Sequence, residues 1–346
     1  MRFIGTEKKI NALYCKTISY MLTFCVIKER GMFMDVVKIG VDIGNYDTKT
    51  QHCQIASGYK RYDVKPEIVR KVLSYKGSYF ALDDNERMPY VVDKTKNDQC
   101  LILTLMGIAE ELIYLASDKK DNLQEEIDKV KEIKLGLGLP PGHFTKYSLK
   151  TLNYYKNNLE GLGEFTYKNC KFSFIVSEIK IFPQDFVAVY KNPNCQTAKK
   201  KRYYIIGIGG GTVDVVPVVN GQPDANKCFS LESGTRVMYR EIAADIQRQY
   251  GQMPDEALIE DVLKDEDTSL PEPMIKLIKE DAKLHYEKII NGIAQQGVKL
   301  SLYPSVFFGG GALLFKSFIN ADENISEREI LEDTKANAKA YAACIK

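Results

Sequence analysis

The chain has 346 residues, of which 45% are apolar and 27% charged, and a formal net charge of +2. This length is more than one hydrophobic core comfortably serves, and it suits two domains with a cleft between them. The small charge excludes recruitment of nucleic acid or an acidic membrane through the overall field, while eight scattered cysteines without a CxxC pair indicate reduced thiols rather than a zinc site.

Residues 1–34 form a segment that we interpret as an N-terminal extension. Its apolar stretch, residues 18–27, is too short to span a bilayer and is followed directly by the charges of residues 28–30. A signal peptide would end in small residues instead, which makes secretion the less favoured alternative. We favour the hypothesis that translation begins at Met32 or Met34, because the residues before them can be encoded by a purine-rich run typical of a bacterial ribosome-binding site.

The first half of the chain opens with a predicted β-hairpin. A β-branched run at residues 36–43 ends at a glycine, and after a turn at residues 45–47 a second strand is expected over residues 48–55. The stretch 59–92 is polar, rich in tyrosine and hairpin-like, and residues 99–115 have the apolar spacing of a helix. The remaining predictions for this half are a charged helix or loop at 117–132, a strand at 133–139, a helix around 147–159, strands near 163–167 and 172–182, and a helix at 184–190.

The second half repeats this opening pattern. A loop at residues 191–202 separates the halves, and residues 203–219 again read as strand, glycine turn and strand. Helices are then predicted at 236–250, within an acidic subdomain at 254–296, at 312–318 after a strand at 305–308, and at 333–345. Two halves that begin alike predict an internally duplicated α/β fold with a ligand in the cleft between them.

Three glycine turns supply the candidate binding residues. Such a turn directs several backbone N–H groups toward one point, where a phosphate can accept hydrogen bonds from them. Asp42 could hold Mg²⁺ through water, and Lys49 could neutralise terminal phosphates. Taken singly, each turn is more often structural than a ligand site. The candidate residues are Asp42, Gly44, Asn45, Thr48 and Lys49 in the first turn, Gly209, Gly210, Gly211, Thr212 and Asp214 in the second, and Gly309, Gly310 and Gly311 in the third.

The order of these motifs carries a family resemblance. DIGNYDTK near the start, GGGTVD in mid-chain and VFFGGGALL near the end resemble the phosphate 1, phosphate 2 and adenosine motifs of the actin, Hsp70 and sugar-kinase superfamily. The resemblance covers residues 35–346 and implies an actin-like α/β fold, in which two ribonuclease-H-like domains enclose ATP and Mg²⁺. Within that superfamily, residues 88–95 and 102–105 look like the first-domain insertion of the ParM/StbA group.

The resemblance also implies domain boundaries. It predicts actin-like domain I at residues 35–196, with the ParM-type insertion at about 59–130. Domain II would span residues 197–320, and residues 321–346 would form a C-terminal segment and helix that return to domain I.

The same resemblance implies which side chains perform hydrolysis. Gln184, which follows the strand ending in proline, stands where the family carries a glutamate or glutamine that positions the attacking water. Two alternatives stay open, namely that Gln184 only satisfies helix N-terminal groups, or that Asp185 is the acidic participant. Near the ribose, the early helix of the second domain offers several individually weak candidates. These are Glu232, Gly234, Thr235, Arg236 and Lys283.

One departure from the family pattern affects the metal. The phosphate 2 motif usually begins with aspartate, whereas this chain has Gly207. Asp42 and Asp214 would then hold the water shell of Mg²⁺ without a third carboxylate. We therefore expect weakened Mg²⁺ binding and slow hydrolysis with nucleotide binding retained, and an aspartate restored at position 207 should raise phosphate release.

The predicted function is that of a cytoplasmic ATPase that polymerises into filaments and segregates plasmid or phage DNA through a DNA-bound adaptor. The choice between ATP and GTP stays open. No direct DNA contact is expected, because the basic run 199–202 is typical of a solvated edge, and no membrane contact is expected. The alternatives are a non-polymerising ATP-dependent switch and, less favoured, a small-molecule kinase on the same fold.

Overall fold

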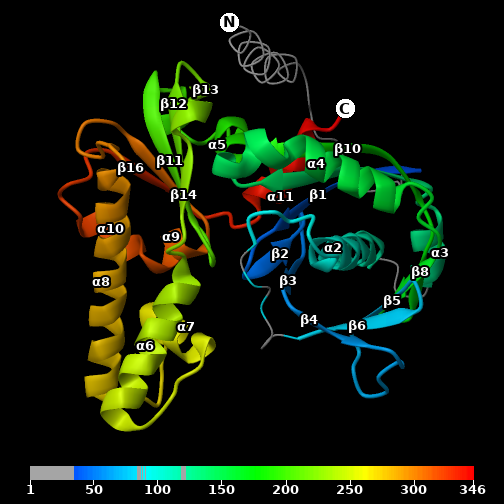
Figure 1. The fold of residues 1–346 in the computed structure, drawn as a ribbon, viewed down its shortest axis with the longest axis horizontal. Coiled ribbons are helices and arrows are strands. Elements are labelled where there is room, and N and C mark those ends of the chain that lie inside the picture. The colour runs from blue at the N-terminus through cyan, green and yellow to red at the C-terminus, as the bar shows by residue number, and fades with distance from the viewer. Residues whose placement is uncertain (1–34, 84–86, 88, 90, 118–121) are drawn as a thin grey trace, which may run out of the picture.

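The computed structural model describes residues 35–83, 87, 89, 91–117 and 122–346 of the chain (Figure 1). The predicted extension 1–34 and the two alternative start positions lie outside the described residues, as does part of the 88–95 motif. The described residues form three sheets. Two of them are similar and lie side by side, and the third belongs to the first half of the chain.

The first sheet has the strand order β10-β7-β1-β2-β3. Its central strand is rich in valine and isoleucine and pairs antiparallel with β2 and parallel with β7. The strand predicted at 48–55 is wrong in one respect, because a turn at residues 50–53 divides it in two; the Thr50 amide donates to the Cys53 carbonyl at 3.0 Å. The strands are β1 (Val36–Ile43), β2 (Asp47–Lys49), β3 (Gln54–Ala56), β7 (Glu132–Leu139) and β10 (Ile175–Pro183).

The second sheet repeats this topology with the order β13-β12-β11-β15-β16, and β14 adds to β12. In both sheets a hairpin is followed by two parallel strands on the same side of its first strand, as β11 pairs antiparallel with β12 and parallel with β15. The predicted internal duplication is therefore confirmed. The strands are β11 (Arg202–Ile208), β12 (Val213–Val219), β13 (Gln222–Pro223), β14 (Phe229–Leu231), β15 (Ser305–Phe308) and β16 (Arg328–Leu331).

The third sheet corrects the predicted extent of the insertion. Its order is β4-β6-β5-β8-β9, so two strands beyond residue 130 complete the sheet that the insertion begins. They join it because alternate side chains of β8 and β9, such as Phe165 and Phe172, are buried in the same core. The strands are β4 (Tyr59–Tyr62), β5 (Val72–Tyr75), β6 (Ser78–Leu82), β8 (Phe165–Tyr167) and β9 (Cys170–Phe172).

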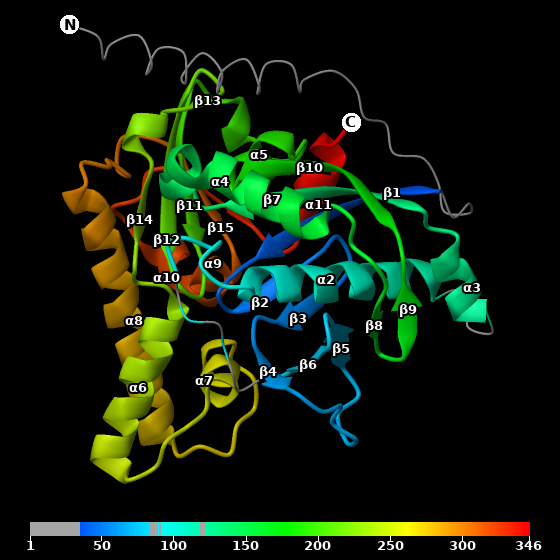
Figure 2. The same ribbon diagram turned by 45° about the vertical axis from the view of Figure 1, so that its right-hand side comes forward.

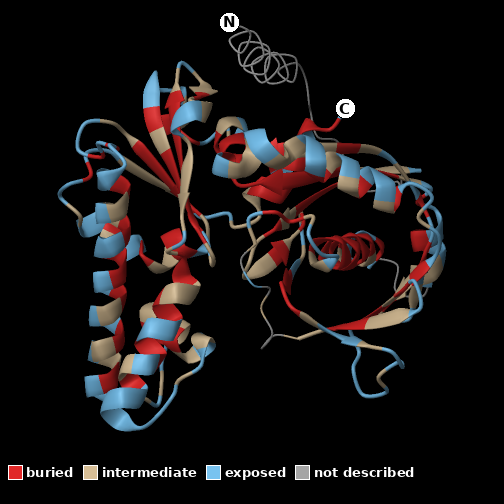
Figure 3. Cartoon of the chain, in the orientation of Figure 1, coloured by how far each residue is buried: buried red, intermediate tan, exposed pale blue. Residues whose placement is uncertain are grey.

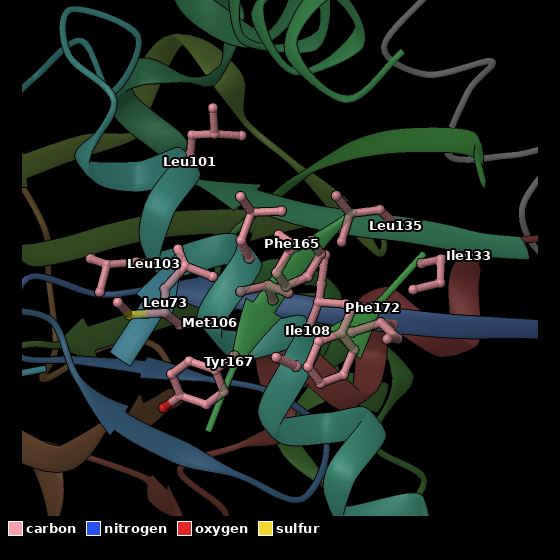
Figure 4. Packing of buried hydrophobic residues seen from close by; sticks show 14 of the residues in the cluster. Leu73, Leu101, Leu103, Met106, Ile108, Ile133, Leu135, Phe165, Tyr167 and Phe172 are labelled. Carbon is pink, nitrogen blue, oxygen red and sulfur yellow. The ribbon is translucent and has the colours of Figure 1, made fainter. Parts of the chain in front are cut away.

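Helix α2 (Gln99–Ala116) is the core helix of the first half. Figure 3 shows it buried along its length, and Figure 4 shows Leu103 and Met106 of α2 among side chains from β5, β7 and β8. Among the described residues, α2 is the one helix long and apolar enough to cross a membrane, but 72% of it is buried inside the protein. Its apolar character is therefore explained by packing in the core.

Other helices cover the sheets at bounds that differ in part from those predicted. Helix α4 (Pro141–Leu159) begins well before residue 147, because proline is favoured at the first helical position. Helix α5 (Phe186–Lys191) begins after Gln184, which lies in a turn. The other helices are α3 (Leu123–Asp128), α6 (Thr235–Tyr250), α7 (Glu256–Leu263), α8 (Glu272–Gln295), α9 (Gly310–Leu314), α10 (Lys316–Ala321) and α11 (Ala336–Cys344), with short 3-10 turns η2 (Thr197–Lys199) and η3 (Ala225–Lys227).

The chain's last segment divides between the two halves, which corrects the prediction that all of residues 321–346 return to domain I. Strand β16 pairs with β15 in the second sheet, because its Ile330 and Leu331 continue that sheet's apolar surface. Helix α11 crosses back and packs on β1, so closely that a side chain on Gly40 would lie 2.8 Å from the carbonyl carbon of Ala338. Figure 2 shows α11 between the two halves, near β1 and β7.

Candidate nucleotide-binding site

The glycine turns of the two hairpins meet at a cavity of about 360 Å³ between the first two sheets. This volume lies in the range of ordinary small-molecule sites. The third glycine turn, at the end of β15, closes another side of the cavity. Of the predicted residues, those that line it are Asp42, Gly44, Asn45, Lys49, Gln184, Asp185, Gly209, Gly210, Gly211, Thr212, Asp214, Thr235, Gly309, Gly310 and Gly311.

The first two turns are in direct contact, and glycine is required there for space. A side chain on Gly210 would lie 2.7 Å from Cβ of Tyr46, and one on Gly211 would lie 2.9 Å from Cγ of Asn45. In the third turn Gly309 has a φ of 94°, which residues with side chains rarely adopt. The phosphate-type turns of the two halves therefore form one continuous rim of backbone around the cavity.

Helix α6 holds the second turn in place through its own N-terminus. The amides of Thr235 and Arg236 donate to the carbonyls of Gly209 and Gly210, each at 3.0 Å. Gly234 lies directly against this turn, since a side chain there would come within 2.5 Å of the Gly210 carbonyl carbon. Neither Gly234 nor the Arg236 side chain lines the cavity. In this structure both residues help to fix the turn, and their contact with a ribose stays a prediction.

Glu232, Thr48 and Lys283 also do not line the cavity. Thr48 is buried and its hydroxyl hydrogen-bonds Ser57 at 2.9 Å, so it fixes the hairpin from behind. Lys283 is on the exposed face of α8, where its Nζ lies 3.9 Å from Oε1 of Glu287. The helical periodicity around position 283 could not reveal which face of α8 meets the cleft.

Four acidic or amide side chains converge near the end of β1. Nε2 of Gln184 donates to Oδ1 of Asp42 at 2.6 Å, and Nδ2 of Asn337 donates to the other oxygen at 3.2 Å. Asn337 also bridges to Asp185, accepting from its backbone amide at 2.9 Å and donating to its carboxyl at 3.0 Å. Gln184, the predicted water-positioning residue, is thus held at the cavity wall by an amide–carboxyl pair.

Asp185 and Asp214 face one another across the cleft in a buried environment. Burial raises the pKa of Asp185, and the nearby Asp214 and Asp42 carboxyls raise it further against the hydrogen bond from Asn337. Burial also raises the pKa of Asp214, although it accepts hydrogen bonds from Ser230 and, at 2.9 Å, from Thr212. In both cases burial is the largest cause of the raised pKa, so both carboxyls are ionised less readily than exposed ones.

The sequence did not single out Lys94, which lines the cavity and is buried. Its Nζ donates to the carbonyl of Ile43 at 2.6 Å, beside the first turn. Its neighbour Asp93 is anchored by Lys150 at 2.5 Å and by Thr95. Burial of Asp93 opposes ionisation, but these hydrogen bonds outweigh it and lower its pKa to about 2. Asn337 was also missed, because only the fold brings α11 to β1.

The donor set fits a nucleotide with Mg²⁺. The glycine rim offers amides, Lys49 and Lys94 offer positive charge, and Asp42 and Asp214 offer the oxygen atoms that Mg²⁺ prefers. Within the described part of the chain, no three His, Cys, Asp or Glu side chains form a ready metal cluster. Mg²⁺ commonly keeps its waters and binds through one or two carboxylates plus substrate phosphates, and the residues present fit that mode.

Comparisons with known proteins agree with this architecture. Residues 205–321 match the family described as archaeal actin homologue MreB-like, C-terminal. The archaeal actin homologue Ta0583 in complex with ADP superposes with a TM-score of 0.65 at 18% identity, covering 89% of this chain and 98% of its own. Bacillus thuringiensis ParM with ATP gives 0.59 at 12% identity, covering 90% and 97%, and the Alp12 filament gives 0.57 at 14%, covering 89% and 98%. No curated protein sequence matches the chain. The chain is therefore an actin-like protein in its fold, similar in structure to ParM and to the archaeal actin homologues.

Proposed function

We propose that the chain is a cytoplasmic ATPase that binds ATP with Mg²⁺ in the interdomain cavity and polymerises into filaments that segregate plasmid or phage DNA. The observation that carries the proposal is the convergence of three glycine turns and two aspartates on one cavity between duplicated domains. Ta0583 with ADP, ParM with ATP and the Alp12 filament, which share the fold, support nucleotide binding and self-association.

The residues of the site have separate roles in this proposal. The turn amides and Lys49 would bind the phosphates, and Asp42 and Asp214 would hold the water shell of the metal. Bound Mg²⁺ would neutralise charge that develops on the phosphates. Gln184, held by Asp42 at 2.6 Å, orients the attacking water. Removing any of these groups should lower the rate of phosphate release while leaving the folded state intact.

DNA would be reached through a DNA-binding adaptor protein rather than directly. The basic run at residues 199–202 supports this, because Lys200 pairs with Glu327 and Lys199 donates to Gln196 at 2.9 Å on the exposed edge of the second sheet. Exposed, internally paired lysines give little of the phosphate neutralisation that direct DNA binding requires.

The test is to follow pelleting and light scattering of the full chain with ATP, GTP, ADP or no nucleotide while recording phosphate release. ATP-dependent pelleting with phosphate release is the expected result. Lys49→Ala should abolish it, and Lys283→Ala, at an exposed position away from the cavity, should not. Nucleotide binding without pelleting would instead indicate the non-polymerising switch, phosphate transfer to an added acceptor would indicate a kinase, and no nucleotide binding at all would refute the proposal.

A further inference from the structure

The internal repeat of the fold makes Asp42 and Gly207 equivalent positions. In the first hairpin, Asp42 and Lys49 form the second residue pair counted from the turn. In the second hairpin, Gly207 and Asp214 form the second pair. Position 42 thus directs a carboxylate at the cavity, whereas position 207 has no side chain. A carboxylate at this place in the second hairpin would have to come from elsewhere in the chain.

The space beside Gly207 is filled by a carboxyl group from the first domain. A side chain on Gly207 would begin 2.7 Å from Cγ of Asp185, and nearer still to its Oδ2. Asp185 follows the end of β10, in the sheet opposite to β11, and is 6% exposed. Glycine at 207 therefore does not leave an empty position, because the Asp185 carboxyl lies where the first atom of a residue-207 side chain would be.

The backbone at Asp185 is strained in a way that places this carboxyl. Asp185 has a φ of 62° and a ψ of −44°, and the Phe186 amide donates to the Gln184 carbonyl at 2.6 Å, which makes Asp185 the centre of a γ-turn. This form of the turn is rare and costly for a residue with a side chain. Asn337 holds both the amide and the carboxyl of Asp185 in this conformation. A glycine would adopt it without strain, so the side chain is retained at a cost.

We propose that Asp185 supplies, from the first domain, the Mg²⁺-directed carboxylate that position 207 of the second hairpin lacks. The inference rests on the proposed nucleotide function and deepens it. Asp42 and Asp185 would then face the metal's water shell from one domain and Asp214 from the other. This revises the expectation that Gly207 by itself weakens Mg²⁺ binding, and it reverses the expected effect of Gly207→Asp, which would force two carboxyls into one space.

The experiment measures how strongly Mg²⁺ tightens ADP binding. The dissociation constant of a fluorescent ADP analogue is determined with saturating Mg²⁺ and with chelator, for the full chain and its variants. Asp185→Asn keeps the shape and the acceptor for Asn337 but removes the charge, and we expect it to reduce the Mg²⁺-dependent tightening about tenfold, as losing a metal's supporting carboxylate commonly does. Glu111→Gln, which alters a buried carboxyl that does not line the cavity, is the control and should leave the tightening unchanged.

A carboxylate swap decides between a metal role and a purely structural one. Gly207→Asp alone should lower the melting temperature without strengthening the Mg²⁺ dependence of ADP binding. Asp185→Gly alone should abolish that Mg²⁺ dependence. The double variant Asp185→Gly/Gly207→Asp should recover it to within about threefold of the natural chain. If circular dichroism shows that Asp185→Asn is unfolded, the double variant still distinguishes a metal role from a structural one.

Three results would overturn the inference: unchanged Mg²⁺ dependence in a folded Asp185→Asn variant, no recovery in the double variant, or ADP binding by the natural chain that Mg²⁺ does not affect. These are distinct from failure of the proposed function, in which the natural chain would bind ADP in neither buffer. Tight ADP binding that Mg²⁺ does not affect would refute the metal role and leave nucleotide binding standing.

Discussion

Asn337→Ala tests whether the C-terminal helix holds the two carboxyls of the first domain in place. The substitution removes hydrogen bonds to Asp42 and Asp185 and leaves the buried amide of Asp185 without its acceptor. Hydrogen bonds to charged groups contribute roughly 1.5–3 kcal/mol each, and the raised pKa of Asp185 places this case at the lower end. We expect a loss of about 3 kcal/mol, or about 6–12 °C in Tm at roughly 2–4 °C per kcal/mol.

The assay is thermal unfolding without nucleotide, followed by circular dichroism, with Asn324→Ala as the matched control. Asn324 bonds to Asp322 in an exposed turn, so its loss should cost no more than about 0.5 kcal/mol. Equal effects of the two substitutions would refute the reasoning, because they would show that the Asn337 network contributes nothing beyond an ordinary surface turn.

Three further expectations follow from contacts described above. Gly234→Ala should lower the free energy of unfolding by about 2–3 kcal/mol in chemical denaturation, because its new methyl group would overlap the backbone of the second glycine turn. In the control Gly163→Ala the methyl group meets nothing within 4 Å, and this variant should be as stable as the natural chain. Equal denaturation midpoints for the two variants would contradict this. Lys94→Gln should weaken ATP binding at least tenfold in a fluorescence titration, whereas Lys96→Gln, at an exposed position two residues away, should not. Equal losses of ATP affinity in the two variants would exclude a specific role for the buried Lys94 ammonium. Asp93→Asn should cost about 1 kcal/mol at neutral pH, since the lysine partner of this carboxyl is half exposed. Because the folded-state pKa of Asp93 is lowered from 3.8 to about 2, that stabilisation is present above pH 4 and lost as the pH falls toward 2. The difference in Tm between the natural chain and Asp93→Asn should therefore narrow over this interval. A constant difference would disprove the reasoning.

The sequence was sufficient for features that depend on local patterns. A β-branched run that ends in a glycine turn predicts a hairpin wherever it occurs, and its recurrence at residues 203–219 predicted the duplication that the two sheets confirm. The three glycine turns that line the cavity were predicted for the same reason, since glycine turns are visible in sequence.

Features that depend on distant packing could not be predicted. Asn337 and Asp42 lie 295 positions apart, and only the return of α11 to β1 makes them partners. Lys94 and Lys283 look equally plausible as cationic ligands in sequence, and only their burial in the fold separates them. The position of β16 was missed because four residues with two apolar side chains carry too weak an alternation to be distinguished from a loop.

The placement of α11 has a consequence for synthesis on the ribosome. The helix is made after every strand on which it packs, and its Asn337 holds the carboxyls at the end of β1. At roughly 5–20 residues per second, β1 waits on the order of tens of seconds for this partner. A nascent chain therefore carries its glycine turns long before its acidic centre is fixed, so the cavity between the two halves is completed only when this helix has been made.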